Sequence, residues 1–151
     1  MTPRRKRSKK RSAANSIAAE RLKGATFYLD QSIYSKVLLE RMREAGANVE
    51  HAGSAFASST QDHVWLEGCG KQGWIVLNRD ERIRYRRLEI EALRDHGVAA
   101  FCFTGGNVTA DETADIIVPL IQKFVNMSIS EPKPFLYTFG RSARPNPVKL
   151  R

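Results

Sequence analysis

The chain has 151 residues, a net charge of +9 and an apolar share of 42%, which is typical of a single globular domain with an ordinary core. It contains no run of roughly 20 apolar residues that could cross a membrane, and its basic start lacks the apolar stretch of a signal peptide. Its two cysteines, Cys69 and Cys102, are too few for a disulfide framework and indicate reduced thiols. We therefore expect a cytoplasmic protein without a membrane partner.

Most of the positive charge lies in the first segment of the chain. Residues 1–12 hold seven cations and no acid, whereas the rest of the chain holds 18 cations against 16 acids. Residues 1–24 are predicted to be a disordered basic tail, because a run this charged cannot bury enough apolar surface to fold. The tail could bind nucleic-acid phosphates without sequence preference, or it could serve only to keep the protein soluble. Residues 141–151 form a second predicted tail, which is basic and contains proline.

Between the tails, residues 25–140 repeat a pattern of strand, polar turn, helix and glycine. Short apolar runs predict strands at residues 26–30, 74–78, 98–103 and 135–139, and a further strand is predicted at residues 48–52. Apolar residues at helical spacing predict helices at residues 32–45, 62–71 and 86–96. A fourth helix is predicted to begin at a capping box of Thr109 and Glu112 and to break at Pro119. This alternation predicts an α/β fold with a mostly parallel sheet of about five strands.

Four polar side chains stand where predicted strands end or a predicted helix begins. Asp30, Asp80 and Asn107 follow the first, third and fourth strands, and Asp62 opens the second helix. Because the carboxyl ends of parallel strands share one edge of the sheet, residues far apart in sequence meet there. Three carboxylates with no lysine among them repel one another unless a cation neutralises them. Since hard oxygen ligands suit Mg²⁺ or Mn²⁺, the sequence predicts a site for one of these ions.

Each of these acids also has an ordinary structural explanation. Asp62 could be the N-cap of its helix, and Asp80 could be a turn residue after a strand. Asp30 is the hardest to explain in this way, because it follows directly from a buried strand. The coincidence of all three acids at one edge favours a site.

A group of arginines surrounds Asp80 in the sequence: Arg79, Arg82, Arg84, Arg86 and Arg87. Guanidinium groups beside a carboxylate site could hold a phosphodiester backbone. The alternative is that they form a solvated surface and pair with the nearby glutamates. We favour phosphate binding, because the group lies beside the predicted carboxylate site.

The order of these motifs resembles the PIN-domain family of metal-dependent ribonucleases, and within it the compact toxins of the VapC type. The likeness covers about residues 26–127. It rests on short segments at residues 27–30, 45–49, 62–66 and 73–80. The resemblance implies a three-layer α/β/α fold and an enzyme that cuts single-stranded or structured RNA, often held inactive by an antitoxin protein.

The resemblance also implies a role for each candidate residue. Asp30 and Asp80 would bind Mg²⁺ or Mn²⁺ directly, and Asp62 would do so directly or through a water molecule. Asn107 would support them with its amide oxygen. The RNA phosphates would be positioned by arginines near the third strand: Arg79, Arg82 and Arg84. Besides RNA, an antitoxin and a second copy of the chain, forming a homodimer, are the partners to consider.

One position departs from the family's pattern. After the third strand the family usually has threonine or serine, any residue, aspartate, any residue, aspartate and phenylalanine. Here the chain has Asn78, Asp80 and Arg82 at the three polar positions, so an arginine replaces the second aspartate. The alternative to a nuclease is therefore a degenerate PIN-like module that binds RNA or a protein without cutting. A nuclease acting on DNA is a third and lesser alternative.

Overall fold

The structure is a computed structural model that describes residues 3–57 and 59–150, with side chains described from residue 13 onwards. Its centre is a six-stranded sheet of β1 (Thr26–Leu29), β2 (Asn48–His51), β3 (Ile75–Asn78), β4 (Ala99–Phe103), β5 (Phe135–Phe139) and β6 (Asn146–Val148). The strands lie in the order β2-β1-β3-β4-β5-β6. The first five are parallel, and β6 runs antiparallel to β5. The chain thus moves outward from β1 to β2 and then returns to add β3 on the other side of β1.

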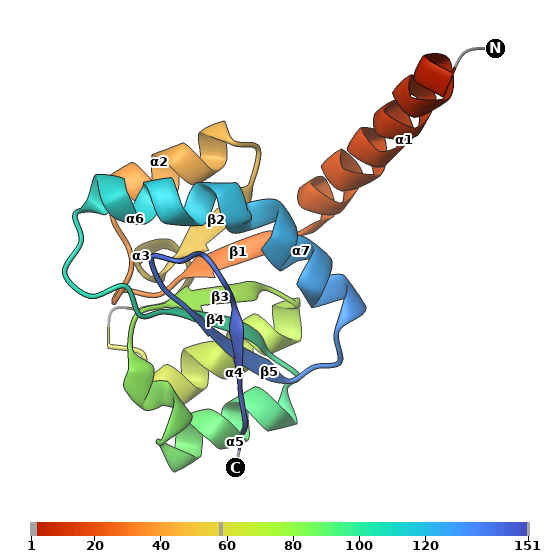
Figure 1. The fold of residues 1–151 in the computed structure, drawn as a ribbon. Helices are drawn as coiled ribbons and strands as arrows, with labels where there is room; N and C mark the ends of the chain where they lie inside the picture. The colour runs from red at the N-terminus through yellow and green to blue at the C-terminus, as the bar shows by residue number, and fades with distance from the viewer. Residues whose placement is uncertain (1–2, 58, 151) are drawn as a thin grey trace.

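Helices cover both faces of this sheet (Figure 1). On one face lie α2 (Lys36–Glu44), α6 (Ala110–Ile117) and α7 (Ile121–Ser130), and on the other lie α4 (Asp62–Gln72) and α5 (Arg87–Asp95). The remaining elements are α1 (Pro3–Gly24), α3 (Ala52–Ala55) and the 3-10 turns η1 (Glu81–Arg84) and η2 (Val118–Leu120). The layers confirm the predicted three-layer α/β/α fold.

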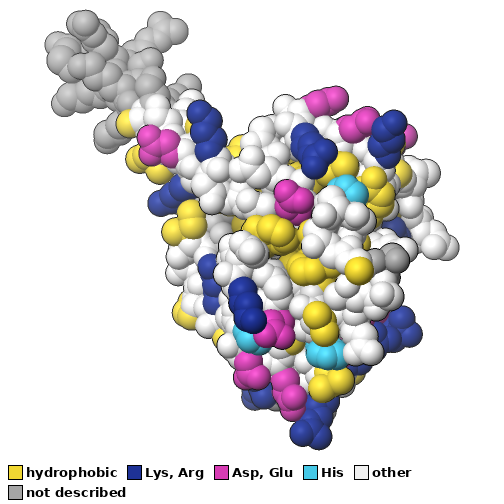
Figure 2. Space-filling model, turned by 180° about the vertical axis from the view of Figure 1, so that it is seen from behind, with side chains coloured by type: hydrophobic (Ala, Val, Ile, Leu, Met, Phe, Trp, Pro, Cys, Tyr) yellow, Lys and Arg dark blue, Asp and Glu magenta, His cyan; other side chains and the backbone are white. Residues whose placement is uncertain are grey.

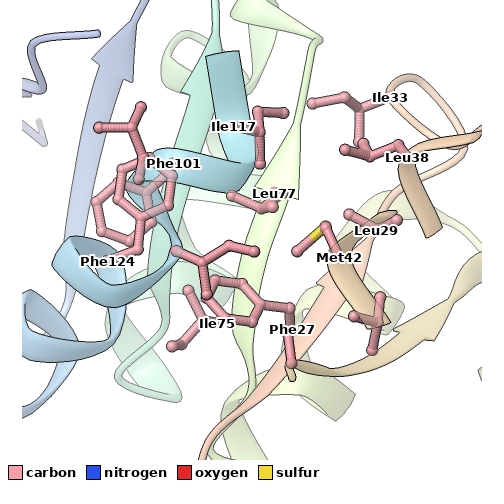
Figure 3. Close-up of a cluster of buried hydrophobic side chains, with 14 of the residues drawn as sticks. Phe27, Leu29, Ile33, Leu38, Met42, Ile75, Leu77, Phe101, Ile117 and Phe124 are labelled. Atoms are coloured by element: carbon pink, nitrogen blue, oxygen red, sulfur yellow. The ribbon is translucent and has the colours of Figure 1, made fainter. Parts of the chain in front are cut away.

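Alternating side chains of the strands divide the core between the two faces. Phe27 and Leu29 of β1 point toward α2 and α7, whereas Tyr28 points toward α4. All three are buried, because both faces of a parallel sheet are covered. Figure 3 shows the larger of the two clusters, where the rings of Phe101 and Phe124 stack with their centroids 4.0 Å apart.

Local signals in the sequence fix several helix ends. Ser35 caps α2 by accepting a hydrogen bond from the Leu38 backbone N–H at 3.0 Å. The predicted capping box of Thr109 and Glu112 is present at the start of α6. Pro119 lies in η2, which separates α6 from α7 as predicted.

The structure differs from the sequence prediction in three segments. Part of the predicted C-terminal tail forms β6, which adds to the sheet edge beside β5. Between the predicted second strand and the predicted second helix, where no further element is predicted, the chain forms the short helix α3. Residues 3–24, which their composition predicts to be disordered, form α1, a helix that extends away from the domain (Figure 1). Alanine, arginine and lysine are good helix formers, and the only proline in this segment stands at its start, where a helix tolerates it.

Neither sign of charge dominates the face of the folded body that is seen in Figure 2. On the face seen in Figure 2, acidic and basic side chains are interspersed, as the near-neutral composition after residue 12 predicts. None of the helices that the structure describes is long and apolar enough to cross a membrane.

Candidate functional site

The sheet order places the candidate acids at a point where α/β proteins commonly bind ligands. The strand order reverses between β1 and β3, so the connections after these two strands leave in opposite directions and open a crevice at their carboxyl ends. Asp30 follows β1 and Asp80 follows β3 at this point. The strands are joined here by a hydrogen bond of 3.0 Å from the Asp30 backbone N–H to the Leu77 carbonyl.

Asp30 is held by Ser32 and by no described cation. Its Oδ2 accepts hydrogen bonds from the Ser32 hydroxyl at 2.6 Å and from the Ser32 backbone N–H at 3.3 Å. The same hydroxyl accepts the Arg79 backbone N–H at 2.9 Å, so Ser32 connects the ends of β1 and β3. Burial raises the pKa of Asp30, and the charge of Asp62 adds to this, although the bonds from Ser32 partly oppose it. The ionised Asp30 carboxylate is therefore costly in the folded protein.

Asp80 lies in the opposite electrostatic environment. Its Oδ1 caps η1 by accepting the Arg82 backbone N–H at 3.0 Å, and the Arg82 guanidinium pairs with the same oxygen at 3.0 Å. Burial alone would raise the pKa of Asp80, but the hydrogen bonds and charge of Arg82, together with the charge of Arg86, outweigh it and lower the pKa. The ionised form of Asp80 is therefore stabilised by the fold.

Asp62 is the first residue of α4 and does not cap it. The N-cap position belongs to Gln61, so the structural explanation of Asp62 as an N-cap is wrong. Its Oδ1 accepts the Trp65 indole N–H at 2.9 Å, and its Oδ2 accepts a hydrogen bond from Arg86 Nη1 at 3.2 Å. Trp65 therefore orients the carboxylate toward the ends of the strands.

The guanidinium group of Arg86 connects Asp62 with Asp80. Arg86 Nη1 lies 3.2 Å from Asp62 Oδ2, 3.5 Å from Asp80 Oδ2 and 3.5 Å from Glu89 Oε1. Glu89 is only 8% exposed, and it is one of the nearby glutamates with which the arginines pair in the alternative explanation of this group. The three-residue spacing from Arg86 places both side chains on one face of a helix start. Arg86 thus occupies the position between Asp62 and Asp80 and supplies the positive charge that these carboxylates need.

The other candidate residues have contacts of their own. Asn107 lies in the exposed loop after β4, where its carbonyl accepts a hydrogen bond from Arg141 at 3.2 Å. The Arg79 guanidinium donates to the Gly106 carbonyl and lies 5.3 Å from the centre of the Phe103 ring. These contacts hold the loop after β4, and none of the hydrogen bonds among described residues joins the Asn107 side chain to an aspartate.

Arg84 is the last of the predicted RNA-binding residues. Its guanidinium lies 4.9 Å from the centre of the Tyr85 ring, and its buried Nε has no hydrogen-bond partner among the described residues. The Oδ1 atom of Asn78, at the end of β3, is also buried without such a partner. Both are polar atoms close in sequence to Asp80, and unpaired buried groups of this kind are commonest at functional sites.

The donor atoms have the right chemistry for a divalent cation, but they are not assembled around one point. The oxygens of Asp30, Asp62 and Asp80 are the hard ligands that Mg²⁺ and Mn²⁺ prefer. In the part of the chain that the structure describes, no group of three or more acids, histidines or cysteines is arranged to hold a metal ion. Arg86 lies between two of the acids, so a cation could bridge them only after its guanidinium has moved.

Two comparisons with known proteins give a match to this chain. A family model described as a PIN like domain matches residues 25–105, a range that includes β1 to β4 and all three aspartates. A protein of Mycobacterium tuberculosis (strain ATCC 25618 / H37Rv), named "Putative ribonuclease VapC45", is 27% identical over 115 residues, which cover 74% of this chain and 83% of the relative. No solved structure matches the chain significantly.

Proposed function

Because the chain belongs to the PIN-like domain family, we propose that it is a metal-dependent endoribonuclease that hydrolyses RNA phosphodiesters. The observation that carries this proposal is the position of Asp30 and Asp80 after neighbouring strands at the switch point between β1 and β3, with Asp62 linked to Asp80 through Arg86. The ribonuclease name of its mycobacterial relative supports RNA as the substrate. We further propose that it is the toxin of a toxin–antitoxin pair and acts in the cytoplasm, with an antitoxin and a second copy of the chain as protein partners; of these points, the VapC name supports the toxin role.

In this proposal, the acids hold Mg²⁺ or Mn²⁺. Asp30 and Asp80 bind the ion directly, Asp62 binds it directly or through water, and Asn107 adds its amide oxygen. A bound cation of this kind lowers the pKa of a coordinated water molecule and neutralises charge on the phosphate. The raised pKa of Asp30 supports its role, since a cation would relieve the cost of ionising this carboxylate.

The arginines are proposed to hold the RNA backbone. Arg82 is the best suited of these residues, because its side chain is 73% exposed and can turn from Asp80 toward a phosphate. Arg79 and Arg84 would contact neighbouring phosphates. Arg86 would have to leave Asp62 and Asp80 when the cation binds, and an RNA phosphate is an alternative partner for its guanidinium.

A degenerate module that binds RNA or a protein without cutting it is the second candidate function. Two observations favour it: Arg82 stands where the family usually has an aspartate, and Arg86 already neutralises Asp62 and Asp80. In such a module the arginines would have replaced the metal ion permanently.

An RNA cleavage assay distinguishes the two functions. Purified protein with Mn²⁺ should cut single-stranded RNA, and Asp80→Asn should reduce the rate more than about 100-fold, because even indirect partners of a metal are worth 10–100-fold. Asp95→Asn, which changes an exposed acid at the end of α5, is the matched control and should keep the wild-type rate. Equal rates for Asp80→Asn and wild type would contradict the proposed role of Asp80. No cleavage by wild type, combined with tight RNA binding, would favour the degenerate module.

A further inference from the structure

A pocket of about 280 Å³ opens beside two of the candidate acids. It lies where the ends of β1 and β2 meet α3 and α4, and Asp30 and Asp62 form part of its wall. Much of the remaining wall is aromatic, formed by Tyr28, Tyr34, Phe56 and Trp65. No lysine or arginine is among its described lining residues. This volume is large enough to receive a planar ring system.

The inner aromatic rings of the pocket are fixed by packing. Tyr28 is only 1% exposed, and its ring centroid lies 5.2 Å from that of Trp65 and 5.5 Å from that of Phe56. Trp65 is fixed further by its hydrogen bond to Asp62. These rings therefore form a rigid floor, which needs little reorganisation to receive a ligand.

The outer ring of the pocket is accessible. Tyr34 is 40% exposed, and its ring stacks on His51 with centroids 4.7 Å apart and an angle of 22° between the planes. Stacking on His51 fixes the orientation of the Tyr34 ring while part of the ring remains open. A large aromatic side chain that is both oriented and exposed is well suited to stack a planar ligand.

We propose that this pocket binds one unpaired base of a single-stranded RNA, stacked on Tyr34. The inference rests on the proposed function and adds to it a binding pocket for one base and the residue on which that base stacks. Unpaired bases commonly stack on aromatic side chains of proteins that bind single strands. The pocket shares Asp30 and Asp62 with the candidate metal site, so its occupant would be the nucleotide next to the phosphate that is cut.

The positions of the charges favour a base over a phosphate or a peptide side chain. Arg82 pairs with Asp80, and neither residue lines the pocket. A strand held by Arg82 would pass the acids with its backbone and direct a base into the uncharged part of the pocket. A cationic side chain from a protein could also enter an aromatic pocket beside two carboxylates. Arg86 already pairs with Asp62, however, which reduces the negative charge available to it.

Binding of fluorescein-labelled single-stranded oligoribonucleotides, followed by fluorescence anisotropy in EDTA to prevent cleavage, tests the inference. Tyr34→Ala should weaken binding about 5- to 100-fold, because stacking one base is worth about 1–3 kcal/mol. Tyr34→Phe should bind within about twofold of wild type, because it keeps the ring. Tyr34→Leu keeps apolar volume without an aromatic face and should behave like Tyr34→Ala. Ile129→Ala, which changes an exposed apolar residue on α7, is the control and should bind like wild type.

An oligonucleotide with one abasic position identifies the base concerned. Scanning the abasic position along the strand should reveal one site where wild type loses affinity and Tyr34→Ala does not, because the two changes remove the same contact. Equal affinity of wild type, Tyr34→Ala and Tyr34→Leu for the intact strand would overturn the inference. If wild type still cleaves RNA in that case, the proposed function stands without the base pocket.

Two further outcomes would also overturn the inference. If wild type neither binds nor cuts single-stranded RNA, the proposed function fails and the base pocket fails with it. If N-acetyl-arginine amide changes tryptophan fluorescence in wild type but not in Tyr34→Ala, while RNA affinity is independent of Tyr34, the pocket belongs to a peptide side chain.

Discussion

Asp30 and Asp80 follow neighbouring parallel strands, yet their surroundings shift the pKa values of their carboxyl groups in opposite directions. Asp30 is half-buried, accepts hydrogen bonds from Ser32, and has a raised pKa. Asp80 pairs with Arg82 and Arg86 and has a lowered pKa. The difference shows that the charge of Asp80 is stabilised by two arginines, whereas burial opposes the charge of Asp30 and the hydrogen bonds from Ser32 offset this only in part. On this view, a divalent cation would bind Asp30 with the larger gain in free energy, because it would neutralise a carboxylate that has no other cation among the described residues. Next to Asp80 it would have to compete with Arg86.

Removal of Arg86 should give the largest change in stability. Arg86→Met leaves the buried Glu89 without its cation and also exposes Asp62 and Asp80 to each other's charge. We expect the free energy of unfolding to fall by about 1–3 kcal/mol, less than for a fully buried pair because the Arg86 side chain is partly exposed. Urea unfolding measures this change, with Arg87→Met as the control, because Arg87 pairs only with the helix-surface residue Glu91.

The same variant tests whether arginine and metal are alternatives. Mn²⁺ should stabilise Arg86→Met more than wild type, because binding to the folded state adds stability by mass action and the site no longer contains a competing guanidinium. Equal stabilisation of both proteins would contradict the view that Arg86 occupies the position of the cation.

A smaller change in stability is expected when Ser32 is replaced, because Ser32 connects the ends of β1 and β3. Ser32→Ala removes the hydroxyl that donates to Asp30 and accepts the Arg79 backbone N–H. We expect a loss of about 1 kcal/mol in the free energy of unfolding. The pKa of Asp30, followed by NMR, should rise further because a hydrogen bond to the ionised carboxylate is lost. Ser130→Ala, at the end of α7, serves as the control, and an unchanged Asp30 pKa would argue against this role of Ser32.

The smallest expected effects are changes in melting temperature, which should have opposite signs for variants of Asp30 and Asp80. The raised pKa of Asp30 means that its contribution to stability is fully present at low pH and is lost as the pH rises through the raised value. The lowered pKa of Asp80 means that its contribution is present at neutral pH and is lost as the pH falls through the lowered value. In EDTA at pH 7, Asp30→Asn should therefore raise the melting temperature, and Asp80→Asn should lower it.

Both differences should become smaller as the pH falls from 7 and the aspartates become protonated. Thermal unfolding of the two variants and wild type across this range provides the measurement. If both variants change the melting temperature in the same direction at pH 7, the contrast between Asp30 and Asp80 would be contradicted.

The sequence predicts the position of the site better than its contacts. Asp30 and Asp80 could be placed at one edge because each directly follows a short apolar strand and parallel strands end together. The break at Pro119 and the capping box at Thr109 were also predictable, because these signals act within a few residues. The strands β1, β3, β4 and β5 could be predicted from short apolar runs, which are likewise local signals.

The pairing of the acids could not be predicted, because it depends on tertiary structure. Arg86 reaches Asp62 across 24 positions in the sequence and Asp80 across six, and only the packing of α4 against α5 brings them together. Ser32 was assigned to the first helix, whereas in the structure it precedes the Ser35 cap and binds Asp30. The strand β6 was missed because its three residues include a proline, which is tolerated only at the edge of a sheet.

Calorimetric titration of Mn²⁺ into the metal-free protein tests the central claim most directly. Wild type should bind Mn²⁺, and the double variant Asp30→Asn/Asp80→Asn should lose this binding, because the two strand-end carboxylates are the proposed direct ligands. The Asp95→Asn variant should titrate like wild type. Absence of binding to wild type at millimolar Mn²⁺, or equal binding to the double variant, would contradict a metal site at the switch point between β1 and β3.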